Sequence, residues 1–270
     1  MISIITVCYN AADSLKQTID SIVNQNTGKF EYIIKDGGSS DQTCKLIDDY
    51  KSKLKRKLSN FLFLNGVDNG IYDAMNIATN YSKGDYLLFI NAGDELYASN
   101  TIELLNKIVN NCDIYYGNIA QQDDEYQKIV RPIGNIDSLK KNMFFCHQAA
   151  VIKRSVMCEL KYKEKYMICA DYDFFLRAYL QGKQFSYIDQ VIAIFKTDGV
   201  SYKRPFDLID ESYKIREENG IINIAKSQKL RKRNLLKKKI ISLLPVRFYE
   251  YYKKNIKVNI RKIQYKFTKR

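Results

Sequence analysis

Short apolar runs alternate with apolar stripes at helical spacing over the first 120 residues of the chain. The runs are rich in Ile, Val, Leu and Phe, which is typical of parallel strands buried on both faces. The predicted strands are 2–7, 30–35, 61–64, 86–90 and 113–118, and the predicted helices are 13–25, the segment after Asp41, 72–81 and the segment capped by Ser99 or Asn100. This alternation predicts an α/β fold with a mostly parallel sheet flanked by helices.

The second half of the chain has a mixed pattern. Strand patterns occur at 128–131, 149–152 and 185–195, and helical patterns occur at 171–181 and 205–219. We therefore expect residues 1–120 and 121–225 to be two halves of one domain. Residues 226–270 differ from both halves in composition and form a third segment.

The net charge of +14 is concentrated in residues 226–270, which hold 17 of the 44 Lys and Arg residues and one of the 30 acids, Glu250. Apolar and aromatic residues lie between the basic clusters. This composition predicts a basic amphipathic helical tail on an anionic membrane surface, where each Lys or Arg contributes about 1 kcal/mol. One alternative is a solvated basic helix packed on the body. The other is nucleic-acid binding, which we do not expect because no recognition fold accompanies the charge.

Cysteine, histidine and hydropathy narrow the chemistry further. The six cysteines are scattered without a C-x-x-C pair, which favours free thiols in a reducing cytoplasm over a zinc site. His147 is the only histidine, so clusters of several histidines around a metal are excluded by count. No apolar run reaches the roughly 18 residues that span a bilayer, so we expect no membrane-spanning helix.

Polar side chains follow three of the predicted strands. Tyr9 follows the first strand, Asp36 ends the second, and Asp94 follows the strand at 86–90. Ligands of open α/β sheets bind outside the carboxyl ends of the strands, and hard divalent cations prefer carboxylates that they share with phosphates. Asp94 is therefore a candidate metal ligand, and Asp36 a candidate partner of a base or ribose. Polar turns that lead into capped helices are the simpler alternative.

Two further segments are rich in acids. Asp68 and Asp73 lie before and inside the helix at 72–81, where Asp68 can act as a cap and Asp73 is left unexplained. Asp171 and Asp173 open the helix at 171–181, where acids also complement the helix dipole. The functional alternative is that one of these two is a general base, which must lie within hydrogen-bond reach of the hydroxyl that it deprotonates.

Five motifs in this order resemble family 2 glycosyltransferases, and they are most similar to the bacterial branch that builds exopolysaccharide, capsule or O-antigen units, the colanic-acid-type transferases. The motifs are SIITVCYN at 3–10, DGGSSDQT at 36–43, GIYDAMN at 70–76, GDYLLFINAGD at 84–94 and ADYDFFLR at 170–177. FCHQ at 145–148 and TDGVS at 197–201 also resemble this branch. The resemblance covers about residues 1–203.

The resemblance implies a GT-A, Rossmann-like fold in which residues 1–120 bind a nucleotide-sugar donor, with UDP as the expected carrier, and 121–225 bind the acceptor. The implied donor-binding residues are Thr6, Tyr9, Asp36, Asp68, Asp73 and Asn91. Asp94 matches the metal-binding acid, and Asp171 matches the base that activates the acceptor. The implied pocket residues, which contact the donor diphosphate or the acceptor, are His147, Gln148 and Asp173.

The reaction implied by the resemblance is the transfer of a hexosyl or N-acetylhexosaminyl group with inversion at the anomeric carbon. The implied cofactor is Mn²⁺ or Mg²⁺, and the implied acceptor is the hydroxyl of a saccharide linked to polyprenyl diphosphate. A membrane-associated tail at 226–270 would bring such an acceptor within reach. The expected location is therefore cytoplasmic and peripheral, on the inner face of a bacterial cell membrane.

The chain departs from the family pattern at two places. The acid-x-acid that usually precedes the last acid is replaced by Asn91-Ala92-Gly93, and the Glu that usually precedes the base is Ala170. These changes leave open a catalytically inactive, membrane-associated protein that binds sugar nucleotides. A sugar-phosphate nucleotidyltransferase is the enzymatic alternative, but it requires a Gly-rich loop with Lys or Arg after the first strand, and residues 9–13 have neither.

Overall fold

The computed structural model describes residues 1–58, 60–122, 127–196 and 204–242. Its two compact units are Met1–Arg204 and Pro205–Arg270, each of which is considered by itself. The strands of the first unit are β1 (Ile2–Cys8), β2 (Glu31–Asp36), β3 (Asn60–Asn65), β4 (Tyr86–Phe89), β5 (Glu95–Leu96), β6 (Ile114–Gln122), β7 (Gln127–Val130), β8 (Ala150–Lys153) and β9 (Phe185–Lys196). Its α-helices are α1 (Ala12–Val23), α2 (Thr43–Lys57), α3 (Ile71–Tyr81), α4 (Thr101–Ile108), α5 (Arg154–Leu160) and α6 (Ala170–Leu180).

The described strands form one sheet in the order β3-β2-β1-β4-β8-β6-β9-β5, with β7 paired to β6. β1 pairs in parallel with β2 and with β4, and β2 pairs in parallel with β3. The prediction of a mostly parallel sheet in the first half is therefore confirmed, and its first two strands are neighbours. Because these strands run in the same direction, the residues that follow β1, β2 and β4 emerge at one edge of the sheet.

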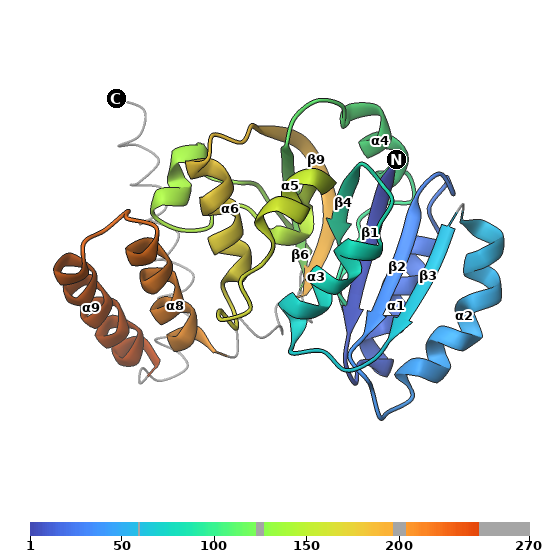
Figure 1. Ribbon diagram of the computed structural model, residues 1–270, viewed down its shortest axis with the longest axis horizontal. Coiled ribbons are helices and arrows are strands. Elements are labelled where there is room, and N and C mark those ends of the chain that lie inside the picture. Colours follow the sequence, from blue (N-terminus) through green and yellow to red (C-terminus); the bar gives the residue numbers. More distant parts are fainter. Residues whose placement is uncertain (59, 123–126, 197–203, 243–270) are drawn as a thin grey trace. The chain divides into compact units, whose positions relative to one another are not determined.

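Helices cover both faces of this parallel half (Figure 1). One face of β1 and β2 packs with α1 and α2 through buried apolar residues such as Ile4, Ile19 and Ile47. The helix α3 contacts β1 and β2 as well and is seen in front of the sheet. Strand residues buried on both faces explain why these strands consist of continuous apolar runs.

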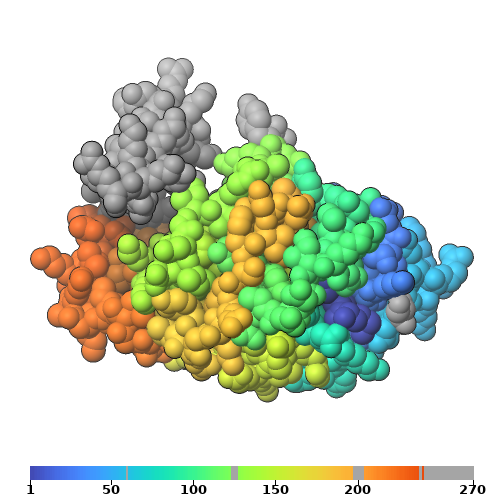
Figure 2. Space-filling model, turned by 90° about the horizontal axis from the view of Figure 1, so that it is seen from above, coloured from blue at the N-terminus to red at the C-terminus, as the bar shows by residue number. Residues whose placement is uncertain are grey.

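The second half of the sheet is mixed. β8 is antiparallel to both β4 and β6, β9 is parallel to β6, and the short β5 is antiparallel to β9. In Figure 2 the amber surface of β9 lies between green residues near 100 and lime residues near 140. The pairing of β6 with β9 is irregular around Gly117, where an added Cβ would lie 2.7 Å from Ile192 Cδ1 and 2.9 Å from the Gln190 carbonyl oxygen. Only glycine fits this close approach of the two strands.

Most predicted elements are present with ends shifted by one to a few residues. The structure also contains elements that the sequence pattern did not predict: β5, α5 and the two 3₁₀ turns Ile136–Lys140 and His147–Ala149. Asn100 is the N-cap of α4, but its side chain makes no capping hydrogen bond. Asp41 accepts hydrogen bonds from the backbone N–H groups of Thr43 (2.9 Å) and Ala12 (3.3 Å), so it ties the start of α2 to the start of α1.

A buried aromatic cluster joins α3, β4 and α6. Tyr162 lies at its centre, with ring contacts to Tyr72 and Phe174. His147 stacks on Phe89 with ring centroids 5.3 Å apart, and its Nε2 lies 2.7 Å from the Tyr162 hydroxyl. Asn76 of α3 fixes the Tyr162 backbone with two hydrogen bonds, one to its carbonyl and one from its N–H, both 2.9 Å long. Because these partners are buried, the cluster holds the end of α3 against the chain that precedes α6.

The second unit contains a pair of contacting helices, α8 (Pro205–Glu218) and α9 (Ile224–Ser242). Arg231 of α9 binds both oxygens of Asp210 at 2.7 Å, and Asn234 donates to the Tyr213 hydroxyl at 2.9 Å. The compact unit Pro205–Arg270 contains the segment 205–225 together with α9, and the division of the domain into halves at 1–120 and 121–225 stays a prediction.

The helix α9 is strongly basic, as expected, but its sequence does not separate apolar and basic residues onto two faces. Residues 243–270, which include the second part of the predicted tail, lie outside the described residues. Within the part of the chain that is described, none of the helices has the length and apolar character needed to cross a membrane.

The stability of the first unit should fall as the pH drops from 6.5 towards 4. Burial lowers the pKa of His147 from 6.5 to about 4, so between these values the unfolded chain binds more protons than the folded one. The contribution of neutral His147 is complete above the unfolded pKa and is lost as the pH falls through the folded pKa. The free energy of unfolding should lose about 1.4 kcal/mol per pH unit from this residue, as measured by urea unfolding at several pH values.

The control is His147→Gln, which keeps a polar group beside Tyr162 but cannot titrate. The difference in the free energy of unfolding between the wild type and this variant should be constant above pH 6.5. Below pH 6.5 the wild type should lose stability relative to the variant. A difference that stays the same at every pH would contradict the assignment.

Candidate functional site

The loop after β2 is built around a buried carboxylate. Asp36 is 0% exposed, and its Oδ2 accepts hydrogen bonds from the N–H groups of Gly38 (3.0 Å) and Ser39 (2.8 Å). Its Oδ1 accepts a hydrogen bond from the Ser39 hydroxyl at 2.5 Å. Gly38 has a φ of 85°, which favours glycine, so the turn closes tightly around Asp36. The contact of Asp36 with a nucleoside stays a prediction, and in this structure its carboxylate organises the loop.

The loop after β1 is attached to the same turn. Asn10 accepts a hydrogen bond from the N–H of Ser40 (2.9 Å) through its Oδ1, and its own N–H donates to the Ser39 hydroxyl at 2.8 Å. Tyr9 is 65% exposed beside this turn. An added Cβ on Gly37 would lie 3.3 Å from the Tyr9 ring and 3.0 Å from Asp68 Oδ2. The predicted donor-binding residues Tyr9 and Asp68 therefore flank Gly37.

Asp68 is held by a buried lysine that the sequence motifs did not single out. Lys35 of β2 is 3% exposed, and its Nζ lies 2.7 Å from Asp68 Oδ2 and 2.7 Å from the carbonyl oxygens of Asp36 and Gly66. A buried ammonium group requires such a complete set of acceptors. Its sequence signal was a lysine at the end of an otherwise apolar strand, directly before Asp36.

The two acids of the segment 68–73 also organise the start of α3. Asp68 Oδ1 accepts a hydrogen bond from the N–H of Gly70 at 3.1 Å, and Asp73 Oδ2 accepts one from the N–H of Asn69 at 2.8 Å. Both acids therefore bind backbone N–H groups of the loop before α3, although neither makes a helix-capping hydrogen bond. Their contact with a donor stays a prediction.

Thr6 lies inside the sheet, directly behind the loop that carries Asp94. It is 0% exposed; its hydroxyl donates to the Ile90 carbonyl at 2.6 Å and accepts a hydrogen bond from the Tyr32 hydroxyl at 3.1 Å. In this structure Thr6 supports the end of β4, and its predicted contact with the nucleoside is untested.

The turn Asn91–Asp94 is fixed from α1 by a second buried threonine. The Thr18 hydroxyl donates to the Asp94 carbonyl at 2.7 Å and accepts a hydrogen bond from the N–H of Gly93 at 3.0 Å. Gly93 has a φ of 100°, a conformation that an aspartate in its place would adopt only with strain. The turn therefore disfavours an acid at position 93, directly before Asp94.

The Asp94 carboxylate is buried and bound from the other half of the domain. Asp94 is 7% exposed, and its Oδ2 accepts a hydrogen bond from Gln148 Nε2 at 2.9 Å. Gln148 in turn accepts a hydrogen bond from the Cys146 thiol through Oε1 at 2.8 Å. Because Oε1 is occupied by the thiol, the NH₂ group of Gln148 is directed to Asp94. Gln148 thus touches the candidate metal ligand, whereas His147 points into the aromatic cluster.

The oxygen atoms of this turn fit a hard divalent cation. Asn91 Oδ1 is buried and has no hydrogen-bond partner in the structure as described, which is unusual for a polar atom. The residues described contain no group of three or more His, Cys, Asp and Glu side chains that could hold a metal ion. Asp94 and Asn91 could supply oxygens to such a cation, and phosphate oxygens and water would be its other ligands.

Asp171 stands at the start of α6 and is connected to α3. Its Oδ1 accepts hydrogen bonds from the N–H of Tyr172 (2.8 Å) and from the Tyr72 hydroxyl (3.4 Å). Burial and the Asp171 carboxylate raise the pKa of Tyr72 well above its usual value, so this hydroxyl stays protonated. Tyr72 was not among the predicted site residues, although it lies in the same motif as Asp73.

Asp94 and α6, the helix that carries Asp171, both contact the segment 145–148. Gln148 binds Asp94 at 2.9 Å, and the Phe145 ring packs against Phe175, one turn after Asp171, with centroids 4.8 Å apart. Burial raises the pKa of the Cys146 thiol, and the carboxylates of Asp94 and Asp171 raise it further. Asp36 ends β2 and Asp94 follows β4. Both lie at the same edge of the sheet because β2 and β4 run parallel to β1, which lies between them.

Asp173 has a different environment from Asp171. Its side chain is 0% exposed and pairs with Arg177 at 2.6 Å and with Lys163 at 3.3 Å. Arg177 also donates to the carbonyl oxygens of Leu160 (2.8 Å) and Lys161 (2.7 Å). This geometry favours a positioning role, in which Asp173 fixes α6 to the preceding chain, over contact with a diphosphate or acceptor.

Solved structures share this fold. The crystal structure of Staphylococcus aureus TarS 1–349 in complex with UDP-GlcNAc is 15% identical, with a TM-score of 0.63 over 87% of this chain and 71% of that chain. The match to the longer TarS chain covers 39% of it. A mannosyltransferase from Pyrobaculum calidifontis in complex with GDP-Man and Mn²⁺ is 14% identical, with a TM-score of 0.59 over 79% of this chain and 63% of that chain. At these identities the similarity shows the GT-A fold.

Sequence relatives are named glycosyltransferases. A PGL/p-HBAD biosynthesis glycosyltransferase of Mycobacterium bovis is 30% identical over 66% of this chain and 70% of its own length. The amylovoran biosynthesis glycosyltransferase AmsB of Erwinia amylovora is 28% identical over 71% of this chain and 68% of its own length. The model of the family described as "Glycosyl transferase family 2" matches residues 3–163, which is more than half of the chain. The chain therefore belongs to glycosyltransferase family 2, as its motifs predicted.

Proposed function

We propose that this protein is an inverting glycosyltransferase that moves a sugar from a UDP-sugar to a hydroxyl of a lipid-linked saccharide. The observation that carries the proposal is that Asp94, after β4, and α6, which carries Asp171, both contact the segment 145–148, through Gln148 and through Phe145 with Phe175. One acid lies on the side where a donor diphosphate would bind, and the other begins a helix of the acceptor half. The TarS structure was solved in complex with UDP-GlcNAc, which supports UDP as the carrier here.

The reaction requires one base and no enzyme nucleophile. Asp171 takes the proton of the acceptor hydroxyl as the hydroxyl oxygen bonds to the anomeric carbon, and the bond from that carbon to the diphosphate breaks with its electron pair. Attack and departure occur on opposite faces, so the configuration inverts. The N–H of Tyr172 donates to Asp171 Oδ1 at 2.8 Å and thereby orients the carboxylate that is proposed to accept the proton. The Tyr72 hydroxyl, which donates to the Ile168 carbonyl at 2.7 Å, lies 3.4 Å from the same oxygen.

A divalent cation, Mn²⁺ or Mg²⁺, would be held by Asp94 and would neutralise the charge that develops on the diphosphate. We propose Asn91 of the same turn as a second oxygen ligand of the cation, because its Oδ1 is buried without a hydrogen-bond partner among the described residues. The structure of the P. calidifontis neighbour, which is a complex with Mn²⁺, supports this choice of cation. Gln148 orients the Asp94 carboxylate through its hydrogen bond to Oδ2.

The remaining assignments follow the halves of the fold. Tyr9, Asp36, Asp68 and Asp73 would surround the nucleoside and close over the donor, while Thr6 supports them from inside the sheet. His147 and Asp173 would act as positioning residues, since both are buried among protein groups. Residues 121–225 would recognise the acceptor. The amylovoran relative supports a saccharide acceptor in bacterial surface polysaccharide synthesis, although its name does not identify the acceptor.

We also propose that the protein acts peripherally at the cytoplasmic face of the membrane, bound through residues 226–270. The exposed basic residues of α9 support this binding. Since apolar residues do not form one face of α9, the attraction would be electrostatic in this helix and would not need insertion into the acyl region. Electrostatic attraction between exposed charges is screened by salt.

Replacing the proposed base should abolish turnover without abolishing donor binding. Asp171→Asn keeps the shape of the side chain and an oxygen that accepts hydrogen bonds, but it cannot accept a proton at neutral pH. General base catalysis contributes about 10²–10⁴-fold, so the release of UDP from a UDP-sugar in the presence of acceptor should fall by at least about a hundredfold. Calorimetry should show unchanged UDP binding. Glu164→Gln, an exposed acid before α6, is the matched control, and equal turnover of the two variants would exclude Asp171 from this role.

Replacing the proposed metal ligand should abolish the effect of the cation on nucleotide binding. Asp94→Asn removes the negative charge but keeps an oxygen for Gln148, so UDP should bind Asp94→Asn with equal affinity with and without Mn²⁺. The wild type should bind UDP at least about tenfold more tightly with Mn²⁺, which corresponds to roughly 1.4 kcal/mol. The control Glu95→Gln removes a neighbouring charge that pairs with Lys196 instead. An unchanged Mn²⁺ effect in Asp94→Asn would refute the assignment.

Binding to anionic vesicles should depend on the charge of α9 and should be reversed by salt. Neutralising Lys226, Lys229, Lys232 and Arg233 with Gln should strongly reduce co-flotation with phosphatidylglycerol vesicles. The matched control neutralises the same number of exposed basic residues on α2, namely Lys45, Lys53, Lys55 and Arg56. Flotation that resists high salt would show insertion instead of electrostatic attachment, and equal loss in both variants would show that α9 has no special role.

A further inference from the structure

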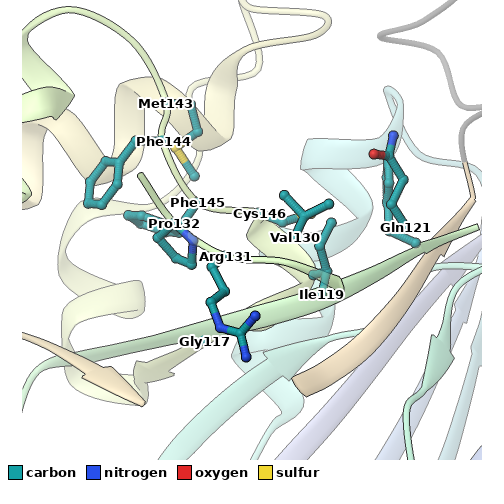
Figure 3. Close-up of a pocket in the computed structure, with 11 residues that line it drawn as sticks. Gly117, Ile119, Gln121, Val130, Arg131, Pro132, Met143, Phe144, Phe145 and Cys146 are labelled. Atoms are coloured by element: carbon teal, nitrogen blue, oxygen red, sulfur yellow. The ribbon is translucent and has the colours of Figure 1, made fainter. Parts of the chain in front are cut away.

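A pocket of about 410 Å³ lies beside the site, in the acceptor half of the first unit. Its walls come from β6, β7, the end of β9 and the chain at 143–146. Figure 3 shows the side chains that line it, with Phe144 and Met143 at one end and Gln121 at the other. Its volume falls within the range of about 300–1,000 Å³ that is common for small-molecule sites. None of the residues to which we assigned a role in the reaction forms this pocket, except that Cys146 lies in its wall.

The lining combines a large apolar surface with one charged group. Its apolar residues are Ile119, Val130, Pro132, Met143, Phe144, Phe145 and Phe195. Arg131 is the single charged side chain among the residues that line the pocket. Arg131 Nε lies 3.6 Å from Asp189, which is longer than the roughly 2.7–2.9 Å of close charged hydrogen bonds. A phosphate can therefore compete for this guanidinium group, which suits phosphate geometry.

The pocket adjoins the catalytic acids through two of its wall residues. The Cys146 thiol donates to Gln148 at 2.8 Å, and Gln148 donates to Asp94 at 2.9 Å. The Phe145 ring packs against Phe175 of α6 with centroids 4.8 Å apart, one turn after Asp171. A ligand in the pocket therefore lies next to the helix that carries the proposed base.

From these contacts we infer that the pocket binds the phosphate and the first part of the hydrocarbon chain of a lipid-phosphate acceptor. Arg131 binds the phosphate, and the apolar walls cover the chain. The inference rests on the proposed function, because it assigns the non-sugar part of the acceptor to a place beside the base. A saccharide alone would find few hydrogen-bond partners in this pocket, since only Gln121, Arg131 and Cys146 among the lining residues have polar side chains.

The experiment measures the binding of three probes to the full-length protein by calorimetry. Farnesyl phosphate carries both parts of the inferred ligand, farnesol carries the chain alone, and inorganic phosphate carries the anion alone. Farnesyl phosphate should bind at least about tenfold more tightly than either part, because a charge-assisted contact and apolar burial then act together. Arg131→Gln should weaken farnesyl phosphate to the level of farnesol, and Phe144→Ala should weaken farnesyl phosphate and farnesol alike.

The matched control is Lys128→Gln, which removes the same charge from an exposed position on β7 outside the pocket. It should bind farnesyl phosphate as the wild type does. Equal weakening by Arg131→Gln and Lys128→Gln, equal binding of farnesol and farnesyl phosphate, or no saturable binding would each overturn the inference. UDP binding with Mn²⁺ is measured on the same proteins. If the wild type binds UDP but not farnesyl phosphate, the pocket assignment alone fails. If the wild type does not bind UDP, the proposed function is refuted.

Discussion

The hydrogen bond from Gln148 to Asp94 connects the two halves of the first unit at the point where the chemistry would occur. Asp94 follows β4 in the parallel half, and Gln148 precedes β8 in the mixed half. A buried carboxylate is stable only with partners that replace water, so this contact helps to satisfy Asp94 and fixes the mixed half of the sheet against the parallel half. Thr18 secures the same turn from α1. The distance between donor and acceptor sides is thereby set by buried hydrogen bonds and does not depend on exposed loops.

A second constraint comes from the acids that are buried or half-buried in the first unit. Asp36, Asp68, Asp94 and Asp173 are stabilised in different ways: by backbone N–H groups, by Lys35, by the Gln148 amide, and by Arg177 with Lys163. The amide of Gln148 carries no charge of its own. A cation at Asp94 would add the positive charge that this amide lacks, which agrees with the assignment of Asp94 as the metal ligand.

Much of this arrangement could be predicted from the sequence. Continuous apolar runs that end in Asp36 and in the turn before Asp94 located β2 and β4, and parallel pairing then placed both acids at one edge. The contacts that hold these acids could not be predicted, because they join residues far apart in the chain, such as Thr18 with Asp94 or Tyr72 with Asp171. Thr18 gave a weak signal as a polar residue on the apolar face of α1. The strand β5 has only two residues and is defined by its pairing with β9, so no local pattern could reveal it.

The glycine that replaces the acid directly before Asp94 changes how a cation would be held. Gly93 adopts a φ of 100° and its N–H donates to the Thr18 hydroxyl, so the turn favours glycine at this position. With Asp94 as the main charged ligand, the protein alone offers a cation few oxygens. The diphosphate supplies further oxygens only when the nucleotide is present. Cation and nucleotide should therefore bind cooperatively, and by linkage each must strengthen the other by the same factor. A site of this kind would hold the cation while the diphosphate is bound and release it with the leaving nucleotide.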